Sequence, residues 1–152
     1  MDPQWTVSLG EGAEILADRY GISREDQDAF AVKSHRRAAR AWQDGAFVDH
    51  LVHLPGVALT RDEGIRDATT ESLAKLRAVF RKDGTVTAGN ASQISDGSAA
   101  LLLASAERAE ELGIEPLARI TANAAHGVDP DIYGEGPVVA VARAGQGRQV
   151  AF

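Results

Sequence analysis

Two amphipathic helices are predicted over residues 10–45 from the spacing of apolar and polar positions. Gly21 is typical of the residue that ends a helix, so the first helix is expected to stop there. Ser23 is a typical N-cap for the second helix, with Asp26 three positions later as in a variant of the capping box. The predicted apolar stripe of the first helix is Ala13, Leu16, Ala17 and Tyr20. That of the second, which should end at Gly45, is Phe30, Ala31, Ala38, Ala41 and Trp42.

Continuous apolar runs predict strands in the C-terminal part of the chain. Residues 99–104 are apolar at every position, which is typical of a strand covered on both faces of a sheet. Residues 117–123 predict a second strand, and short extended pieces are expected within residues 46–68. Two good strands are too few to flank residues 99–104. Either the pieces near residue 50 complete the sheet or its other strands are absent from this sequence, and we favour the second interpretation.

Three shorter helices complete the expected elements. One is predicted over residues 70–77, with Leu73 and Leu76 facing inward. Another should begin after Ser105 and run through Leu112, where Gly113 closes it. The last is expected to open at residues 136–137, because proline is favoured at the first helical position.

Composition excludes several classes of function. The chain has 152 residues and a formal net charge of -6, which argues against a general nucleic-acid-binding protein. It contains no cysteine, which excludes disulfides, thiolate metal sites and a cysteine nucleophile. No stretch approaches the roughly 18 apolar residues of a membrane span, and the first residues do not resemble a signal peptide. We therefore expect a cytoplasmic protein that has neither nucleic acid nor a membrane as its partner.

A loop rich in small residues precedes the first predicted strand. Because Gly84, Ala88, Gly89 and Ala91 carry almost no side chain, the backbone could approach a ligand closely. Taken alone, such a loop is often only a tight turn. The GK[ST] sequence of a P-loop does not occur here.

Five ordered blocks of sequence resemble one enzyme family. The loop reads GTVTAGNAS from Gly84 to Ser92 and continues with Asp96-Gly97, which closely resembles the GTVTAGNAS-x-x-x-DGAAA segment of the thiolases. Further matching blocks lie at residues 2–14, 20–35, 62–80 and 127–137. Together they cover residues 2–142, and on this resemblance the chain is identified as a member of the thiolase family.

The resemblance implies part of an α/β fold. Residues 1–93 would form most of a helical loop domain, residues 94–113 the end of the N-terminal half, and residues 114–152 the start of the C-terminal half. From about residue 144 the tail departs from the family pattern. Thiolases transfer acyl groups between coenzyme A thioesters, either in thiolysis of a 3-ketoacyl-CoA or in a Claisen condensation. They need no metal or redox cofactor. Coenzyme A takes part in the reaction as the thioester substrate.

No catalytic residue of the family has a counterpart in this sequence. The resemblance places the nucleophilic cysteine before Met1, and the catalytic asparagine, histidine and second cysteine after Phe152. We therefore expect the chain alone to be inactive. The alternative is a non-catalytic coenzyme A-binding or interaction module. The expected partners are coenzyme A or acyl-CoA, with a second copy or a separate thiolase half as further candidates.

The same resemblance assigns a coenzyme A pocket to six residues. Arg66 would lie against the adenine end of the ligand, Phe80 would line the pantetheine tunnel, and Ser92 would hydrogen-bond a pantetheine amide. Ala88 and Ala91 would let the loop approach the thioester arm, with Leu73 packed nearby. Without the resemblance, Arg66 is typical of a surface ion pair and Phe80 of a core aromatic residue.

Other charged positions are best interpreted as structural. His50 and His53 lie three apart beside Asp49, but no third ligand is suitably spaced, so a surface pair is favoured over a metal site. Asp28 belongs to the acidic start of the long helix, where the helix dipole favours negative charge. Lys33, Arg36, Arg37 and Arg40 form a basic face. It is interpreted as solvated surface, with a phosphate contact as the alternative.

Overall fold

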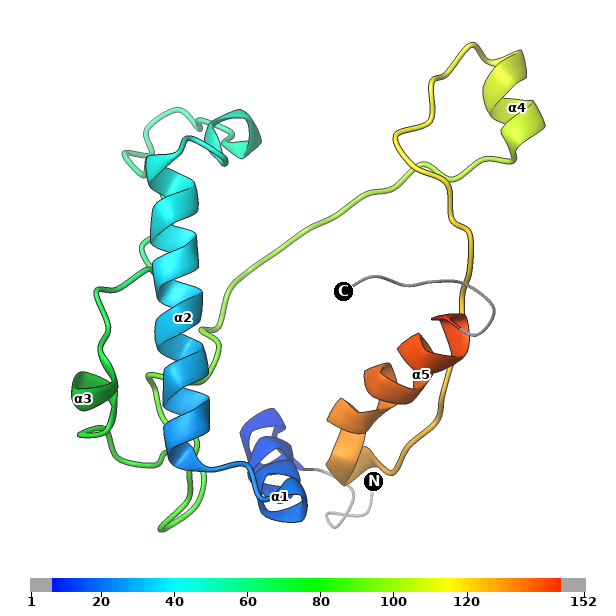
Figure 1. The fold of residues 1–152 in the computed structure, drawn as a ribbon. Coiled ribbons are helices and arrows are strands. Elements are labelled where there is room, and N and C mark those ends of the chain that lie inside the picture. The colour runs from blue at the N-terminus through cyan, green and yellow to red at the C-terminus, as the bar shows by residue number, and fades with distance from the viewer. Residues whose placement is uncertain (1–6, 146–152) are drawn as a thin grey trace. The chain divides into compact units, whose positions relative to one another are not determined.

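The computed structural model describes residues 7–145, which form two compact units (Figure 1). Unit 1 contains residues 7–93 and 130–132, and unit 2 contains residues 94–129 and 133–145. The helices are α1 (Leu9–Tyr20), α2 (Arg24–Gln43), α3 (Thr70–Leu73), α4 (Ala106–Glu111) and α5 (Gly136–Gly145), with 3-10 turns η2 (Val48–His50) and η3 (Pro130–Glu135). The expected departure of the tail after about residue 144 falls almost entirely outside the described residues.

Local caps at Gly21 and Ser23 separate α1 from α2 as the sequence predicts, while α2 ends at Gln43, two residues before the predicted Gly45. Gly21 ends α1 in the left-handed conformation with a φ of 61°, which a residue with a Cβ adopts only at a cost. Ser23 caps α2, and its hydroxyl oxygen accepts a hydrogen bond from the Asp26 amide at 3.0 Å. Ser8 caps α1 in the same way by accepting from the amide of Glu11.

The core of unit 1 meets α2 at Val32, which lies beside the predicted apolar stripe, and the stripe residues Ala31, Ala38, Ala41 and Trp42 are partly buried. Val32, Ala68 and Leu73 form a buried cluster, and Ala31 packs against it. Phe30, which we expected in the stripe, is 73% exposed. That part of the prediction is wrong because the chain returns along the Val32 side of α2, where α3 lies beside it (Figure 1).

The segment after α3 folds back on itself to form the small-residue loop. Helix α3 ends at Leu73 rather than at the predicted residue 77. Its N-terminus is stabilised by a capping box between Thr69 and Ser72. An isolated antiparallel bridge then pairs Ala78 with Thr87. The loop is thereby closed at its base by backbone hydrogen bonding.

Unit 2 contains the predicted helices but not the predicted strands. Helix α4 begins after Ser105 and α5 begins at Gly136, both as expected. Residues 99–104 and 117–123 are exposed and carry no strand pairing, and within residues 7–145 no strand is formed. The α/β class is therefore not confirmed by this structure. A strand requires a neighbour whose N–H and C=O groups pair with its own, and the pieces near residue 50 do not provide one.

The described helices are short or contain many charged residues. None of the helices between residues 7 and 145 combines the length and hydropathy needed to cross a membrane.

Candidate functional site

A buried carboxylate on α1 holds the beginning of the small-residue loop. Glu14 is 1% exposed, and its carboxylate accepts hydrogen bonds from the amides of Thr85 and Val86, each at 2.8 Å. The Thr85 hydroxyl donates a further bond at 2.9 Å. Burial by itself would raise the pKa of Glu14, but the hydrogen bonds from Thr85 and Val86 outweigh it and lower that pKa below its usual value. Glu14 is therefore held as a carboxylate and acts as an anchor.

The anchor requires glycine at the start of the loop. A Cβ placed on Gly84 would lie 2.3 Å from Oε1 of Glu14, well inside van der Waals contact. A second close approach occurs at Gly89, where a Cβ would lie 2.6 Å from methyl carbons of both Leu73 and Leu76. The two glycines let the loop backbone pack directly on α1 and on the α3 segment.

A second polar cluster fixes the far end of the loop. The Asn90 amide group donates to Asp28 Oδ1 and to the Thr85 carbonyl oxygen, both at 3.0 Å. Its carbonyl oxygen accepts from the Thr87 amide at 2.8 Å. Asp28 is 3% exposed and also accepts from Arg24 Nε at 2.8 Å, so its charge is compensated. Thr87 is fully buried at the centre of this cluster.

Two arginines tie the flanking segments to the helices. Arg24 donates to the Leu73 carbonyl oxygen at 2.6 Å, which adds a second hydrogen bond to a group that also accepts from the Leu76 amide at 2.9 Å. Arg81 forms ion pairs with Glu11 and Asp18 on α1. Residues 73–90 are thus bonded to both long helices of unit 1.

Four of the six predicted site residues belong to this loop or support it. Leu73 is buried against Gly89, while Ala88, Ala91 and Ser92 lie on the exposed side of the loop. The Ala91 amide donates to the Thr87 carbonyl oxygen at 3.0 Å, which shapes the turn around Ala88. The loop therefore turns its smallest side chains to the solvent.

The other two predicted residues are exposed and lie on neighbouring segments. The ring of Phe80 rests on Gly10, where a Cβ would lie 2.2 Å from it, yet Phe80 is 45% exposed. The Arg66 amide donates to Nδ1 of His35 on α2 at 3.3 Å. The exposed Arg66 side chain makes no hydrogen bond or ion pair with the described residues. The ligand-binding roles of all six residues remain predictions.

Sequence reasoning missed the residues that hold the site together. Glu14, Asp28 and Thr87 are the buried polar residues of the described chain, and none was a predicted site residue. Asp28 was interpreted as a helix-start acid, whereas its carboxylate bonds Asn90 across 62 residues of sequence. The available signal was Glu14 itself, an acid between the apolar positions Ala13 and Ala17 of an amphipathic helix. The two histidines near residue 50 are exposed, and residues 7–145 contain no cluster of three metal-binding side chains.

Proteins of known family match nearly the whole chain in sequence. The thiolase N-terminal domain family matches residues 2–107. A probable acetyl-CoA acyltransferase of Staphylococcus aureus is 49% identical over 144 residues, covering 90% of this chain and 37% of the relative. A 3-ketoacyl-CoA thiolase of Bacillus subtilis is 46% identical and is covered to 40% of its length.

Solved structures agree with the sequence relatives. The acetyl-CoA acetyltransferase of Bacillus anthracis superposes with a TM-score of 0.83 at 45% identity, covering 95% of this chain and 39% of that one. Human mitochondrial 3-ketoacyl-CoA thiolase, crystallised in complex with CoA, gives 0.85 at 39% identity, covering 96% and 38%. The chain thus spans about two fifths of the length of these relatives, and its fold is part of a thiolase fold. The chain belongs to the thiolase family.

Proposed function

We propose that this chain contributes the coenzyme A-binding loop of a thiolase-type acyltransferase and catalyses no acyl transfer by itself. The observation that carries the proposal is the anchoring of residues 84–92. Buried Glu14 and the Asp28–Asn90 pair hold the loop from behind, and Ala88, Ala91 and Ser92 face outward. A backbone held in one shape before the ligand arrives loses little conformational entropy on binding.

The chemistry of the exposed residues suits the parts of coenzyme A. The guanidinium of Arg66 is planar and permanently charged, so it can stack on adenine and offset phosphate charge. The Ser92 hydroxyl can donate to or accept from an amide of the pantetheine arm. Phe80 offers an exposed apolar ring to the same arm. A solved relative bound to CoA, 39% identical to this chain, supports this choice of ligand.

Acyl transfer itself requires groups that this chain does not contain. The family reaction begins with a thiolate nucleophile activated by a base, and oxyanion donors stabilise its intermediates. The 152 residues include no cysteine. We infer that other thiolase segments would supply these groups, and that residues 99–104 and 117–123 would pair with strands of those segments in an α/β sheet.

Titration with coenzyme A tests the binding role. Calorimetry of the purified chain should detect binding, and Arg66→Ala and Ser92→Ala should each weaken it about tenfold, equal to about 1.4 kcal/mol. Arg61→Ala and Ser98→Ala are matched controls, because both are exposed in loops and make no interaction with the described residues. They should change the affinity less than about twofold. Absence of coenzyme A binding in a folded sample would refute this role.

A thiolysis assay tests the expected inactivity. The purified chain with acetoacetyl-CoA and coenzyme A should show no turnover above a buffer blank. Mixing it with the complementary segments of the Bacillus subtilis thiolase should then restore turnover if the chain belongs to a divided acyltransferase. Coenzyme A binding without restored turnover would favour a non-catalytic coenzyme A-binding module instead.

A further inference from the structure

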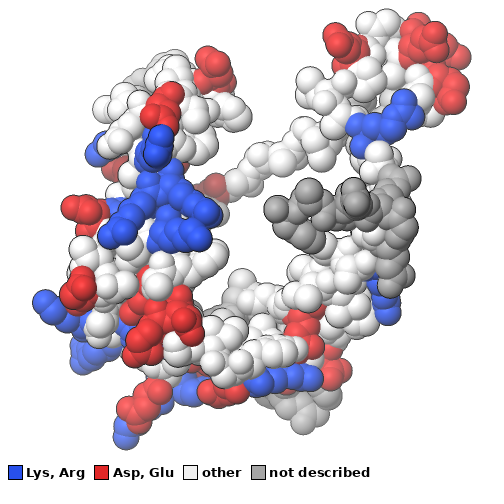
Figure 2. Space-filling model, viewed as in Figure 1, with Lys and Arg blue, Asp and Glu red and all other residues white. Residues whose placement is uncertain are grey.

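The middle of α2 carries a run of positive charge that contains no acidic residue. Residues 29–43 include four basic residues and no acidic residue, although the chain as a whole has a net charge of -6. The four are Lys33, Arg36, Arg37 and Arg40. Their i, i+3 and i, i+4 spacing places them within an arc of about 100° and a length of about 10 Å. Figure 2 shows blue side chains gathered over this helix.

This charge is costly to the helix and has little internal compensation. Like charges three or four residues apart destabilise a helix, and the four residues form four such pairs. Arg40 is paired with Asp44 at 3.3 Å, but both side chains are largely exposed, so the pair is weak. The Arg36 charge also contributes to lowering the pKa of Glu71, after that residue's own backbone amide and the hydroxyls of Thr69 and Thr70. Lys33 and Arg37 have no acidic partner among the described residues.

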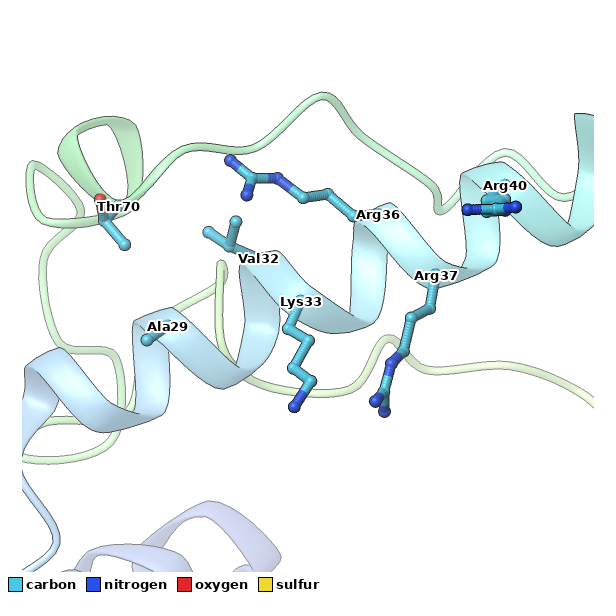
Figure 3. A pocket seen from close by; sticks show the side chains of 7 residues that line it. All are labelled: Ala29, Val32, Lys33, Arg36, Arg37, Arg40 and Thr70. Carbon is cyan, nitrogen blue, oxygen red and sulfur yellow. The ribbon is translucent and has the colours of Figure 1, made fainter.

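The basic residues border a shallow hollow along one side of α2. An open groove of about 460 Å³ runs along α2, with Val32 at its base and Thr70 of α3 at one side (Figure 3). In Figure 3, Lys33 and Arg37 point to the same side of the helix, and Arg36 extends over Val32. A groove lined by charge of one sign concentrates the field and attracts counter-ions.

The groove lies on a different face of α2 from the predicted coenzyme A residue. His35, which accepts the Arg66 amide, is about 150° around the helix from the centre of the basic arc. Arg66 itself does not line the groove.

We propose that this groove is a second anion site, separate from the coenzyme A role proposed above, and that it binds an oligophosphate with at least two phosphate groups. Arginine presents a planar fork of donors that matches phosphate oxygens, and three arginines are available here. Cations spread over about 10 Å suit several linked phosphates better than a single one. The groove is also within the size range of small-ligand sites.

Pyrophosphate is the probe for this site. Calorimetry on the full chain at low and at physiological ionic strength should give saturable binding. The triple variant K33Q/R36Q/R37Q should weaken it at least about tenfold. Glutamine has a helix propensity close to that of lysine and arginine. Because the variant also removes charge repulsion, α2 should stay folded, and far-UV circular dichroism checks this. Arg61→Gln is the matched control and should change the affinity less than about twofold.

Three results would overturn the proposal. The first is absence of saturable binding, or equal binding of pyrophosphate by the triple variant and the Arg61→Gln control. The second is loss of pyrophosphate binding in Arg66→Ala, which would place the phosphate in the coenzyme A pocket. The third is tighter binding of an oligoglutamate peptide than of pyrophosphate, which would make the groove a surface for an acidic protein. If none of these results is found, coenzyme A is added as a competitor. Displacement of pyrophosphate by coenzyme A would identify the phosphates of coenzyme A as the natural ligand. Unchanged pyrophosphate binding would identify a free oligophosphate.

Discussion

The two units of this chain differ in what their polar side chains do. In unit 1, hydrogen bonds of Glu14 and Asn90 join residues 71 and 62 positions apart. In unit 2, the Arg108 side chain donates to Glu111 three residues away, and the Arg143 side chain donates to the Ala125 carbonyl oxygen across 18 residues. Side-chain hydrogen bonds that span more than 60 residues thus hold the candidate site of unit 1 together.

The apolar side chains of the two units also differ in how far they are buried. Leu73 in unit 1 is 6% exposed, whereas Leu101 and Leu102 in unit 2 are 87% and 82% exposed. Of the described residues in unit 2, Ala109 and Gly136 are buried. The comparison teaches that an apolar sequence becomes a core only where a second segment returns to cover it.

The largest expected effect comes from breaking the anchor of unit 1. Glu14→Ala leaves the amides of Thr85 and Val86 buried without an acceptor, which should cost about 4 kcal/mol of unfolding free energy. Urea unfolding measures this, and hydrogen exchange should show faster exchange at residues 84–92. Glu63→Ala, at an exposed loop position, is the control and should change stability by less than about 0.5 kcal/mol. Equal effects of the two variants would contradict the anchor.

A pair of leucine substitutions tests the apolar side of the comparison. Leu73→Ala should cost about 3 kcal/mol because it opens a cavity beside Val32 and Gly89. Leu102→Ala should cost less than about 0.5 kcal/mol in the same unfolding experiment, since its side chain is already exposed. A large loss in Leu102→Ala would mean that unit 2 buries this residue in solution.

A smaller effect is expected at the far end of the loop. Asn90→Ala removes the donor to Asp28 and the acceptor of the Thr87 amide, and should cost about 2 kcal/mol. Thermal unfolding checks the loss, with Asn123→Ala at an exposed position of unit 2 as the control. If both asparagine variants melt together, the cluster contributes nothing to stability.

The subtlest difference should be a dependence on pH. Because the folded-state pKa of Glu14 is lowered, its contribution to stability is fully present above its unfolded pKa of about 4.5 and is lost as the pH falls through the folded value. Urea midpoints measured from pH 6 down to pH 3 should therefore fall for the wild-type chain. The decline should be shallower in Glu14→Gln, which cannot titrate. Parallel curves would rule out Glu14 as a source of the acid sensitivity.

Local chemistry made much of the helical structure predictable from sequence. Ser23, Ser105 and Gly21 act at helix ends through contacts within a few residues, so their roles follow from neighbouring sequence alone. The family and the loop at residues 84–92 could also be predicted from sequence, because the loop's amino-acid sequence itself matches the family motif. The positions of the six predicted site residues followed from that match, while their roles await the coenzyme A titration.

Tertiary structure alone decided which side chains are buried. The predicted stripe included Phe30 and left out Val32. Both are apolar, and only the return of residues 68–73 along α2 decides which of the two is covered. The same holds for Glu14 and Asp28, whose partners lie more than 60 residues away. Residues 99–104 show the opposite case. This run is apolar enough for a buried strand, but it is exposed and forms no strand because no neighbouring strand pairs with it. Caps and turns are local interactions, whereas burial and pairing require a second segment, and a pattern along one chain cannot specify where that segment lies.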